Sequence, residues 1–149
     1  MRAVREKMFA TPWASEWEQK RTMFLYSEEM SSDPLEASLI KELAFMSRPR
    51  RILEVGMFVG YGAAAMLEGA AEAEVVSLEI DPYLKKWVAD SFSSFPDVAK
   101  RHTVAVGPAL ETLPELSGEF GLIFIDASNA GCHSYVRVIL KMSCFLTRE

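Results

Sequence analysis

From residue 51 onward, short apolar runs alternate with polar, helix-forming segments along the chain. The run Leu122-Ile123-Phe124-Ile125 is apolar at four successive positions, which is typical of a parallel strand buried on both faces of a sheet. This alternation predicts right-handed βαβ units and an α/β fold with an open, doubly wound, mostly parallel sheet. The expected strands cover residues 51–55, 75–80, 102–106 and 121–126, and the expected helices cover residues 63–71, 83–92, 108–116 and 135–140.

The first 50 residues carry helical patterns instead. Residues 16–30 are polar with scattered apolar positions and are expected to form a helix. A better helix is expected to begin at Asp33-Pro34, because aspartate is a favoured N-cap and proline fits the first turn. Arg48-Pro49 ends it, because the residue before proline is pushed out of the helical region. One face of this helix is apolar, through Leu35, Leu39, Leu43 and Met46.

The chain is interpreted as one domain over residues 1–149, since this length supports a single hydrophobic core. Its last residues fit neither a helix-ending turn nor another apolar strand. Its parts are an N-terminal helical segment (residues 1–50), the βαβ units (residues 51–140) and a divergent tail (residues 141–149).

Composition excludes several classes of protein. The chain is 50% hydrophobic and 25% charged, which suits a globular domain. Its net charge is −5 and no block of Lys and Arg stands out, so no nucleic acid is expected as a partner. No apolar run approaches the roughly 20 residues that span a bilayer, so no membrane is expected either. Cys132 and Cys144 form no disulfide framework, which suits reduced thiols and a cytoplasmic location.

Candidate chemistry gathers where the first two expected strands end. The loop Gly56-Met57-Phe58-Val59-Gly60-Tyr61-Gly62 follows the first strand, and Glu79 closes the second. Ligands of such sheets bind at the carboxyl ends of the strands, where an acid can accept both hydroxyls of a ribose. The glycine spacing does not match the dinucleotide fingerprint, and no lysine follows the loop as a phosphate loop requires. Either feature by itself, a glycine loop or an acid at the end of a strand, can be purely structural. Their occurrence together, at the ends of the first two expected strands, indicates a nucleoside-bearing cofactor.

The order Glu54-x-Gly56-x-x-x-Gly60 resembles motif I of class I methyltransferases, whose fold is Rossmann-like. From about residue 30 to residue 140 the chain is similar to the metal-dependent O-methyltransferases of the catechol and caffeoyl-CoA type. The resemblance implies S-adenosyl-L-methionine as cofactor, with Glu79 on the ribose. It also implies a small hydroxylated acceptor. The residues expected to bind the cofactor are Glu54, Gly56, Gly60, Tyr61, Glu79, Pro108, Ala109 and Asp126.

The same resemblance places Pro108 and Ala109 beside the adenine and makes Asp126 a metal ligand next to the methyl donor, with Mg²⁺ or another divalent cation assisting catalysis. For Tyr61 two roles stay open, packing near the methionine end of the cofactor or packing in the core. A narrower likeness, through residues 76–85 and 107–113, is to the methyltransferases of gadusol and mycosporine synthesis, which act on cyclitols.

Several positions depart from that family. Asn129 stands where the family has a lysine that assists deprotonation, and Ser128 replaces an acid. The chain shows no Asp-Asn pair after a fifth strand, and residues 141–149 lack the expected Pro-Gly turn, which we interpret as a C-terminal truncation. Leu122-Ile123-Phe124-Ile125 would then lie at a sheet edge, so a partner, for instance a second copy of the chain, is expected to cover it.

Three functions therefore compete. An O-methyltransferase acting on a small hydroxylated molecule is favoured by the loop and Glu79. A non-catalytic relative that binds the methyl donor, or pairs with a complete subunit, is favoured by Asn129. A nucleotide-dependent oxidoreductase is disfavoured by the glycine spacing.

Overall fold

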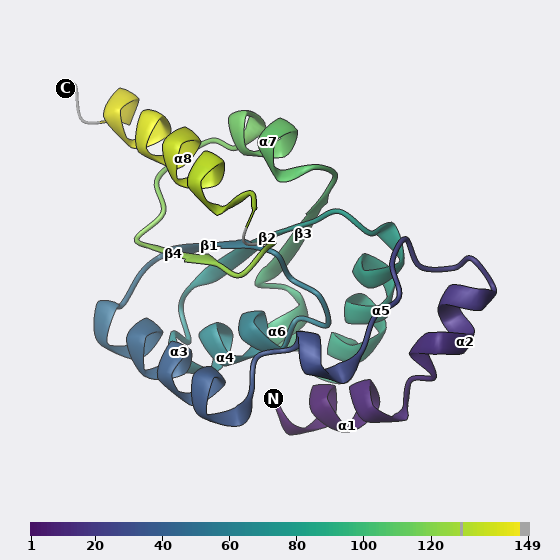
Figure 1. The fold of residues 1–149 in the computed structure, drawn as a ribbon. Helices are drawn as coiled ribbons and strands as arrows, with labels where there is room; N and C mark the ends of the chain where they lie inside the picture. The colour runs from purple at the N-terminus through teal and green to yellow at the C-terminus, as the bar shows by residue number, and fades with distance from the viewer. Residues whose placement is uncertain (129, 147–149) are drawn as a thin grey trace.

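A four-stranded parallel sheet forms the centre of the computed structural model, which describes residues 1–128 and 130–146 (Figure 1). The strands are β1 (Arg51–Val55), β2 (Glu74–Glu79), β3 (His102–Val106) and β4 (Leu122–Ile125). Their order in the sheet is β3-β2-β1-β4, and each neighbouring pair is parallel. The chain moves outward from β1 to β3 and then returns to the other side of β1, so the strand order reverses there. The α/β fold predicted from the sequence is confirmed.

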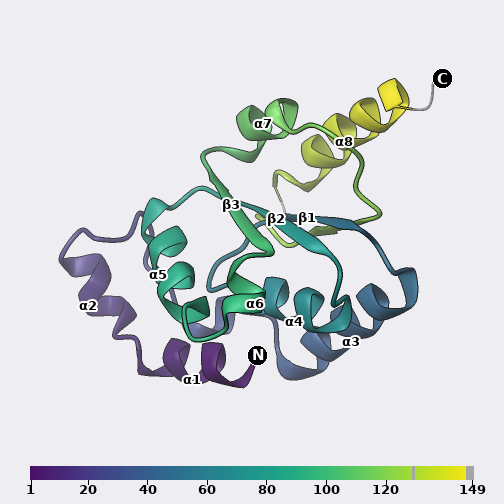
Figure 2. The same cartoon turned by 180° about the vertical axis from the view of Figure 1, so that it is seen from behind.

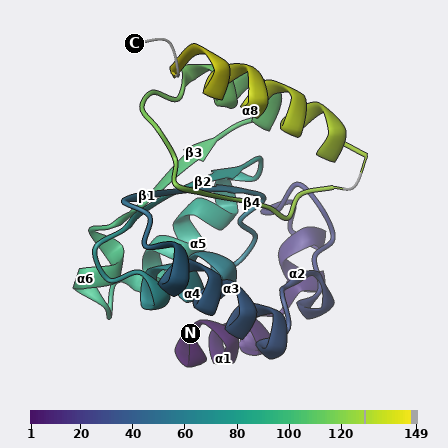
Figure 3. The ribbon, with the colours of Figure 1, turned by 90° about the vertical axis from the view of Figure 1, so that its left-hand side faces the viewer.

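Helices cover both faces of this sheet. Figure 1 and the side view in Figure 3 show α3, α4 and α5 on one face and α7 and α8 on the other. Figure 2 shows the same two layers from behind, with α1 and α2 lying outside α5. Within the described ranges, no helix has the length and apolar character to cross a membrane. The helices are α1 (Arg2–Ala10), α2 (Trp13–Glu18), η1 (Glu28–Met30), α3 (Pro34–Ser47), α4 (Tyr61–Gly69), α5 (Pro82–Phe92), α6 (Pro96–Ala99), α7 (Ala109–Thr112), η2 (Leu113–Glu115) and α8 (Cys132–Leu146).

The expected strand boundaries agree closely with the structure. The residues of β1 and β3 are the expected ones, β2 is displaced by one residue, and β4 is one residue shorter at each end. At the other end of the domain, α8 continues to Leu146, whereas the sequence predicts an end at residue 140 and a divergent tail beyond it. Residues 141–146 contain neither proline nor glycine, so nothing in their chemistry stops a helix.

The packing of α3 corrects the sequence-based expectation. Its N-cap is as predicted, with the Asp33 carboxylate accepting hydrogen bonds from the amides of Leu35 and Glu36 at 2.8 Å each. The large apolar residues, however, point outward. Two alanines and one isoleucine are buried instead. A Cβ at Gly69 of α4 would collide with the carbonyl oxygen of Lys41, so the backbones of the two helices approach closely. The outward residues are Leu35, Leu39, Leu43 and Met46, and the buried ones are Ala37, Ile40 and Ala44.

The expectation of one helix over residues 16–30 is wrong. Helix α2 ends at Glu18, and Lys20 then adopts the left-handed conformation (φ 55°), which turns the chain out of the helix. Residues 21–27 form neither helix nor strand and lead to η1 and α3. Phe24 and Tyr26 of this segment line a cavity beside the carboxyl ends of the strands. This chain path places aromatic side chains of the N-terminal region next to the candidate site.

Strand β4 lies at an edge of the sheet within the described ranges, paired with β1, as the sequence predicts for this stretch. All four of its residues are half-buried. Ile123 and Ile125 pack on the α8 side of the sheet, while Leu122 and Phe124 pack on the α4 side. The partner expected to cover this edge stays a prediction.

Candidate cofactor site

The loop after β1 depends on glycine at its first position. Gly56 has φ +92°, a region that favours glycine, and its amide donates to the Leu78 carbonyl at 3.0 Å. A Cβ at Gly56 would lie 2.6 Å from the Asp126 carbonyl oxygen and 2.8 Å from the Ala127 backbone. The loop can therefore pass beneath the end of β4 only if this position has no side chain. Gly60, with φ +70°, then begins α4 as its N-cap.

The Glu79 carboxylate ends β2 and holds this loop in place. One of its oxygens accepts the amide of Phe58 at 2.9 Å and that of Met57 at 3.3 Å. The other oxygen accepts the Asp81 amide at 3.0 Å. Burial raises the pKa of Glu79, and the backbone amides that face it oppose this shift. Glu79 is thus a buried acid that is fixed by backbone donors and still borders open space.

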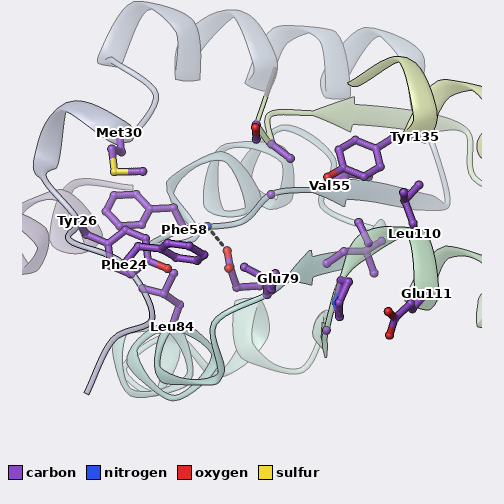
Figure 4. Close-up of a pocket in the computed structure, with 18 residues that line it drawn as sticks. Phe24, Tyr26, Met30, Val55, Phe58, Glu79, Leu84, Leu110, Glu111 and Tyr135 are labelled. Atoms are coloured by element: carbon purple, nitrogen blue, oxygen red, sulfur yellow. Dashed lines mark hydrogen bonds between the residues drawn. The ribbon is translucent and has the colours of Figure 1, made fainter. Parts of the chain in front are cut away.

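That open space is a cavity of about 550 Å³ over the carboxyl ends of the strands (Figure 4). In Figure 4 the rings of Phe24, Tyr26 and Phe58 gather on one side of Glu79, and Tyr135 and Leu110 lie toward the other. A mostly apolar cavity with a few placed polar groups is typical of a small-molecule or cofactor site. The lining residues are Phe24, Tyr26, Met30, Val55, Gly56, Phe58, Leu78, Glu79, Ile80, Leu84, Gly107, Pro108, Ala109, Leu110, Glu111, Ala127, Ser128 and Tyr135.

Gly56, Glu79, Pro108 and Ala109 are the predicted cofactor-binding residues that line this cavity. Gly60 does not line it and shapes the loop from behind, packed against Val88. The structure therefore brings the glycine loop, the acid and the turn after β3 together around one space. Their roles toward a cofactor stay predictions.

Glu54 lies in the interior, beneath the loop. It is only 1% exposed, and its carboxyl forms a 2.5 Å hydrogen bond with the Ser77 hydroxyl. The same hydroxyl lies 2.8 Å from Nε2 of His102 on β3, so three strands share one polar chain. Burial raises the pKa of Glu54 to about 8, so this carboxyl is largely protonated near neutral pH. Its buried position favours a structural role beneath the loop and α4 over direct contact with a ligand in the large cavity.

Asp126 and Tyr61 meet at a second, much smaller hollow of about 10 Å³ that also contacts Glu54, Gly56 and Ser32. The Asp126 carboxylate accepts a long hydrogen bond of 3.4 Å from the Ser32 hydroxyl. Loss of water around it and the nearby charge of Glu36 raise the pKa of Asp126. Tyr61 is 6% exposed and belongs to the core. Both of the roles left open for Tyr61 are thus compatible with its place.

The chain that the structure describes offers no cluster of three His, Cys, Asp or Glu side chains for a metal. Asp126 supplies one carboxylate, and Mg²⁺ is often held by one or two carboxylates with water and substrate oxygens. Asn129, at the position where the family resemblance implies a lysine, lies outside the described residues. Ser128 lines the large cavity.

Sequence reasoning missed the aromatic wall of the cavity. Phe24 and Tyr26 reach it only because the chain leaves α2 early, and Phe58 because it takes a left-handed conformation (φ 48°) that is unfavourable for an aromatic residue. Tyr135 comes from α8 on the far face of the sheet. The alternation of Phe24 and Tyr26 around Leu25 was the one available signal for an extended segment.

A glycine loop after β1, a buried acid at the end of β2 and a cavity at the reversal of strand order define the class of α/β domains that bind a nucleoside-bearing cofactor. Residues 15–144 match the family described as O-methyltransferase. This match covers most of the chain, which therefore belongs to the O-methyltransferase family.

Relatives of known name agree with this membership. The chain is 40% identical over 111 residues to the O-methyltransferase ankF of Aspergillus thermomutatus, which covers 72% of this chain and 46% of that protein. It is 37% identical over 103 residues to the catechol O-methyltransferase of Mycobacterium tuberculosis, covering 68% of this chain and 46% of that protein. The chain thus spans about half the length of the curated relatives it matches.

Solved structures show the same fold. The methyltransferase PaMTH1 of Podospora anserina, determined with SAH bound, superposes with a TM-score of 0.75 at 37% identity, covering 88% of this chain and 56% of that one. The O-methyltransferase TomG of Streptomyces achromogenes, in complex with SAM, gives a TM-score of 0.75 over 93% of this chain and 60% of that one. At 23% identity the second comparison speaks for the fold alone.

Proposed function

We propose that this chain binds S-adenosyl-L-methionine in the 550 Å³ cavity and contributes to methyl transfer onto a hydroxyl group of a small molecule. The observation that carries the proposal is the Glu79 carboxylate, buried beside the glycine loop yet bordering the cavity. Family membership and the SAH-bound relative support the choice of cofactor. The loop spacing, which does not match the dinucleotide fingerprint, argues against a nucleotide-dependent oxidoreductase.

In this proposal Glu79 accepts the ribose hydroxyls, and Pro108 and Ala109 contact the adenine. Gly56 keeps the loop close enough for its backbone to approach the cofactor. Methyl transfer from a sulfonium is an in-line displacement in which the acceptor oxygen forms a bond to carbon while the carbon–sulfur bond breaks. The protein then acts mainly by positioning the two groups and excluding water.

A divalent cation is proposed as an assistant at Asp126, the end of β4. Bound there, it would act as a Lewis acid that lowers the pKa of the acceptor hydroxyl. Asp126 would be one of its ligands, with further oxygens coming from water and the acceptor. Its neighbour Ser32, already hydrogen-bonded to Asp126, would orient the carboxylate.

For the acceptor we propose a polyhydroxylated ring, either a cyclitol of the gadusol-precursor type or a catechol. The second candidate function is a non-catalytic relative that binds the methyl donor or pairs with a complete subunit. The observation that favours this second function concerns Asp126. Within the described ranges, its carboxylate is not part of a cluster of three or more side chains that could hold a metal ion.

Titration calorimetry with S-adenosylhomocysteine tests the proposal. We expect a single site that Glu79→Gln weakens roughly 10- to 100-fold, because an amide cannot replace a charged acceptor of several hydrogen bonds. Glu74→Gln is the matched control, since Glu74 is exposed at the other end of the same strand. Binding of NAD without binding of S-adenosylhomocysteine would overturn the proposal. Binding without methyl transfer to catechol or a cyclitol, with Mg²⁺ present, would select the second function.

A further inference from the structure

Four residues from three separate segments form a closed circuit around the cofactor acid. The Asp81 amide donates to Glu79, Glu79 accepts the amide of Phe58, the ring of Phe58 packs on Tyr26, and the Tyr26 hydroxyl returns to Asp81. The hydrogen bonds donated by the amides of Asp81 and Phe58 measure 3.0 Å and 2.9 Å, and the one donated by the Tyr26 hydroxyl measures 3.1 Å. The ring centroids of Phe58 and Tyr26 lie 5.2 Å apart.

Asp81 is the anchor of this circuit. Its side chain is 0% exposed, and one carboxylate oxygen accepts both the Tyr26 hydroxyl and the Met23 amide, the latter at 2.7 Å. The other oxygen accepts the Tyr83 amide at 2.9 Å and so caps α5. A buried carboxylate with three donors is strongly held, so the segment attached to it is held as well.

We name residues 22–30 the strap. It joins α2 to the start of α3, and three of its side chains, Phe24, Tyr26 and Met30, line the cavity (Figure 4). Met23 and Leu25 of the strap are more than half exposed, so few apolar contacts hold it. Its attachment therefore depends on the bonds to Asp81 and on the ring of Tyr26.

Phe58 makes the glycine loop sensitive to the strap. Its left-handed backbone (φ 48°) is unfavourable for an aromatic residue and persists only because its surroundings hold it. Those surroundings are the Glu79 carboxylate on its amide and the rings of Tyr26 and Trp13, at 5.2 and 5.3 Å, on its side chain. Loss of the Tyr26 contact would release the residue whose amide fixes the cofactor acid.

We propose that Tyr26 and Asp81 are positioning residues that couple docking of the strap to the conformation of Glu79 and the glycine loop. This inference rests on the proposed function for its consequence in cofactor binding. Such coupling is reciprocal. A cofactor bound to Glu79 would stabilise the docked strap, and a docked strap would raise the affinity for the cofactor. Burial and the neighbouring Asp81 raise the pKa of Tyr26, which keeps its hydroxyl a donor to the carboxylate at all moderate pH values.

Hydrogen exchange in the ligand-free protein tests the coupling itself. Tyr26→Phe keeps the ring and removes only the hydroxyl. We expect the amides of Met57 and Phe58 to exchange roughly 3- to 10-fold faster, along with that of Met23, because a net hydrogen bond of ordinary strength is lost. The matched control is Tyr83→Phe, whose hydroxyl interacts with Glu16 in a different groove and should leave these amides unchanged.

Calorimetry then measures the consequence. Tyr26→Phe and Asp81→Asn should each weaken binding of S-adenosylhomocysteine, and the double variant should weaken it by less than the product of the two, because both break one circuit. Acceleration confined to Met23, with Met57 and Phe58 unchanged, would overturn the inference. If the wild-type chain binds no S-adenosylhomocysteine, the proposed function fails, while the exchange rates still decide whether the strap and loop are coupled.

Discussion

The carboxyl ends of β1 and β2 and the outward face of α3 are opposite kinds of surface. At the strand ends, buried polar groups satisfy one another: Glu79 and Asp81 accept backbone amides, and Glu54 bonds to Ser77. Among the described residues, no buried side-chain nitrogen or oxygen atom is without a hydrogen-bond partner. On α3, by contrast, Leu35 is 80% and Leu39 59% exposed.

The difference shows where this sequence specifies its structure tightly. A buried polar group without a partner is costly, so the strand ends have essentially one arrangement. Single apolar residues are common on protein surfaces, so exposure alone does not fix their arrangement. A large contiguous patch of them is typical of an interaction surface. The edge of β4, half-buried and paired on one side within the described ranges, belongs with α3 in this respect. Pairing of the β4 edge with a partner stays a prediction.

The largest expected effect is at Gly56, where the tightly specified region leaves no room. Gly56→Ala should destabilise the domain by about 4 kcal/mol, because it combines a strained φ with contacts below 3 Å to the backbone of Asp126 and Ala127. Gly60→Ala is the comparison. A Cβ there meets side-chain atoms alone, the methyl groups of Val88 at 3.0 and 3.2 Å and the ring of Phe92 at 3.4 Å, so the substitution should cost about 1 kcal/mol. Denaturant unfolding measures both, and equal losses would contradict the packing described.

Neighbouring residues of α3 should respond very differently to alanine. Ile40 is 5% exposed and packs on α4, so Ile40→Ala should cost about 2–4 kcal/mol. Leu39→Ala should change the free energy of unfolding by less than about 0.5 kcal/mol, because Leu39 faces solvent. Thermal or urea unfolding of the two variants decides the orientation of α3. A larger loss at Leu39 would mean that a partner covers this face.

The last expected effect is a pH dependence of stability that arises from Glu54. Its pKa is raised from an ordinary 4.5 to about 8, so the folded state holds a proton that the unfolded state releases, and stability falls as pH rises toward 8. The slope is at most about 1.4 kcal/mol per pH unit. His102, whose pKa burial lowers to about 4, acts in the opposite direction, but only below pH 6.5.

Glu54→Gln isolates this contribution. It keeps a hydrogen-bonding partner for Ser77 and cannot ionise, so its stability should vary less than that of the wild-type chain between pH 6.5 and 8. Unfolding free energies measured at several pH values in that window provide the test. Parallel curves for the two proteins would show that Glu54 does not carry a raised pKa.

Much of the fold followed from local sequence patterns. The apolar run of β4, the glycine after β1 and the acid closing β2 are set by residues close in sequence, and the structure has each within one residue of its expected place. The face of α3 could not be predicted in this way. Large residues at helical spacing suggested the buried side, yet the close approach at Gly69 favours small residues there.

The candidate site divides similarly. Gly56 of the loop, and Pro108 and Ala109 of the turn after β3, line the cavity as predicted, because parallel strands bring their carboxyl ends to one edge. Phe24 and Tyr26 of the strap were missed because the position of this segment depends on contacts across more than 50 residues, from Met23 and Tyr26 to Asp81. Glu54 shows the remaining limit, since a sequence motif gives its place in the strand but not that it points into the interior.

A crystal structure of the chain grown with S-adenosylhomocysteine tests the central claim most directly. The account predicts the ligand in the cavity between the strap and Pro108, with its ribose hydroxyls on the Glu79 carboxylate and the strap still bonded to Asp81. A ligand bound elsewhere, or bound in this cavity without contact to Glu79, would contradict it.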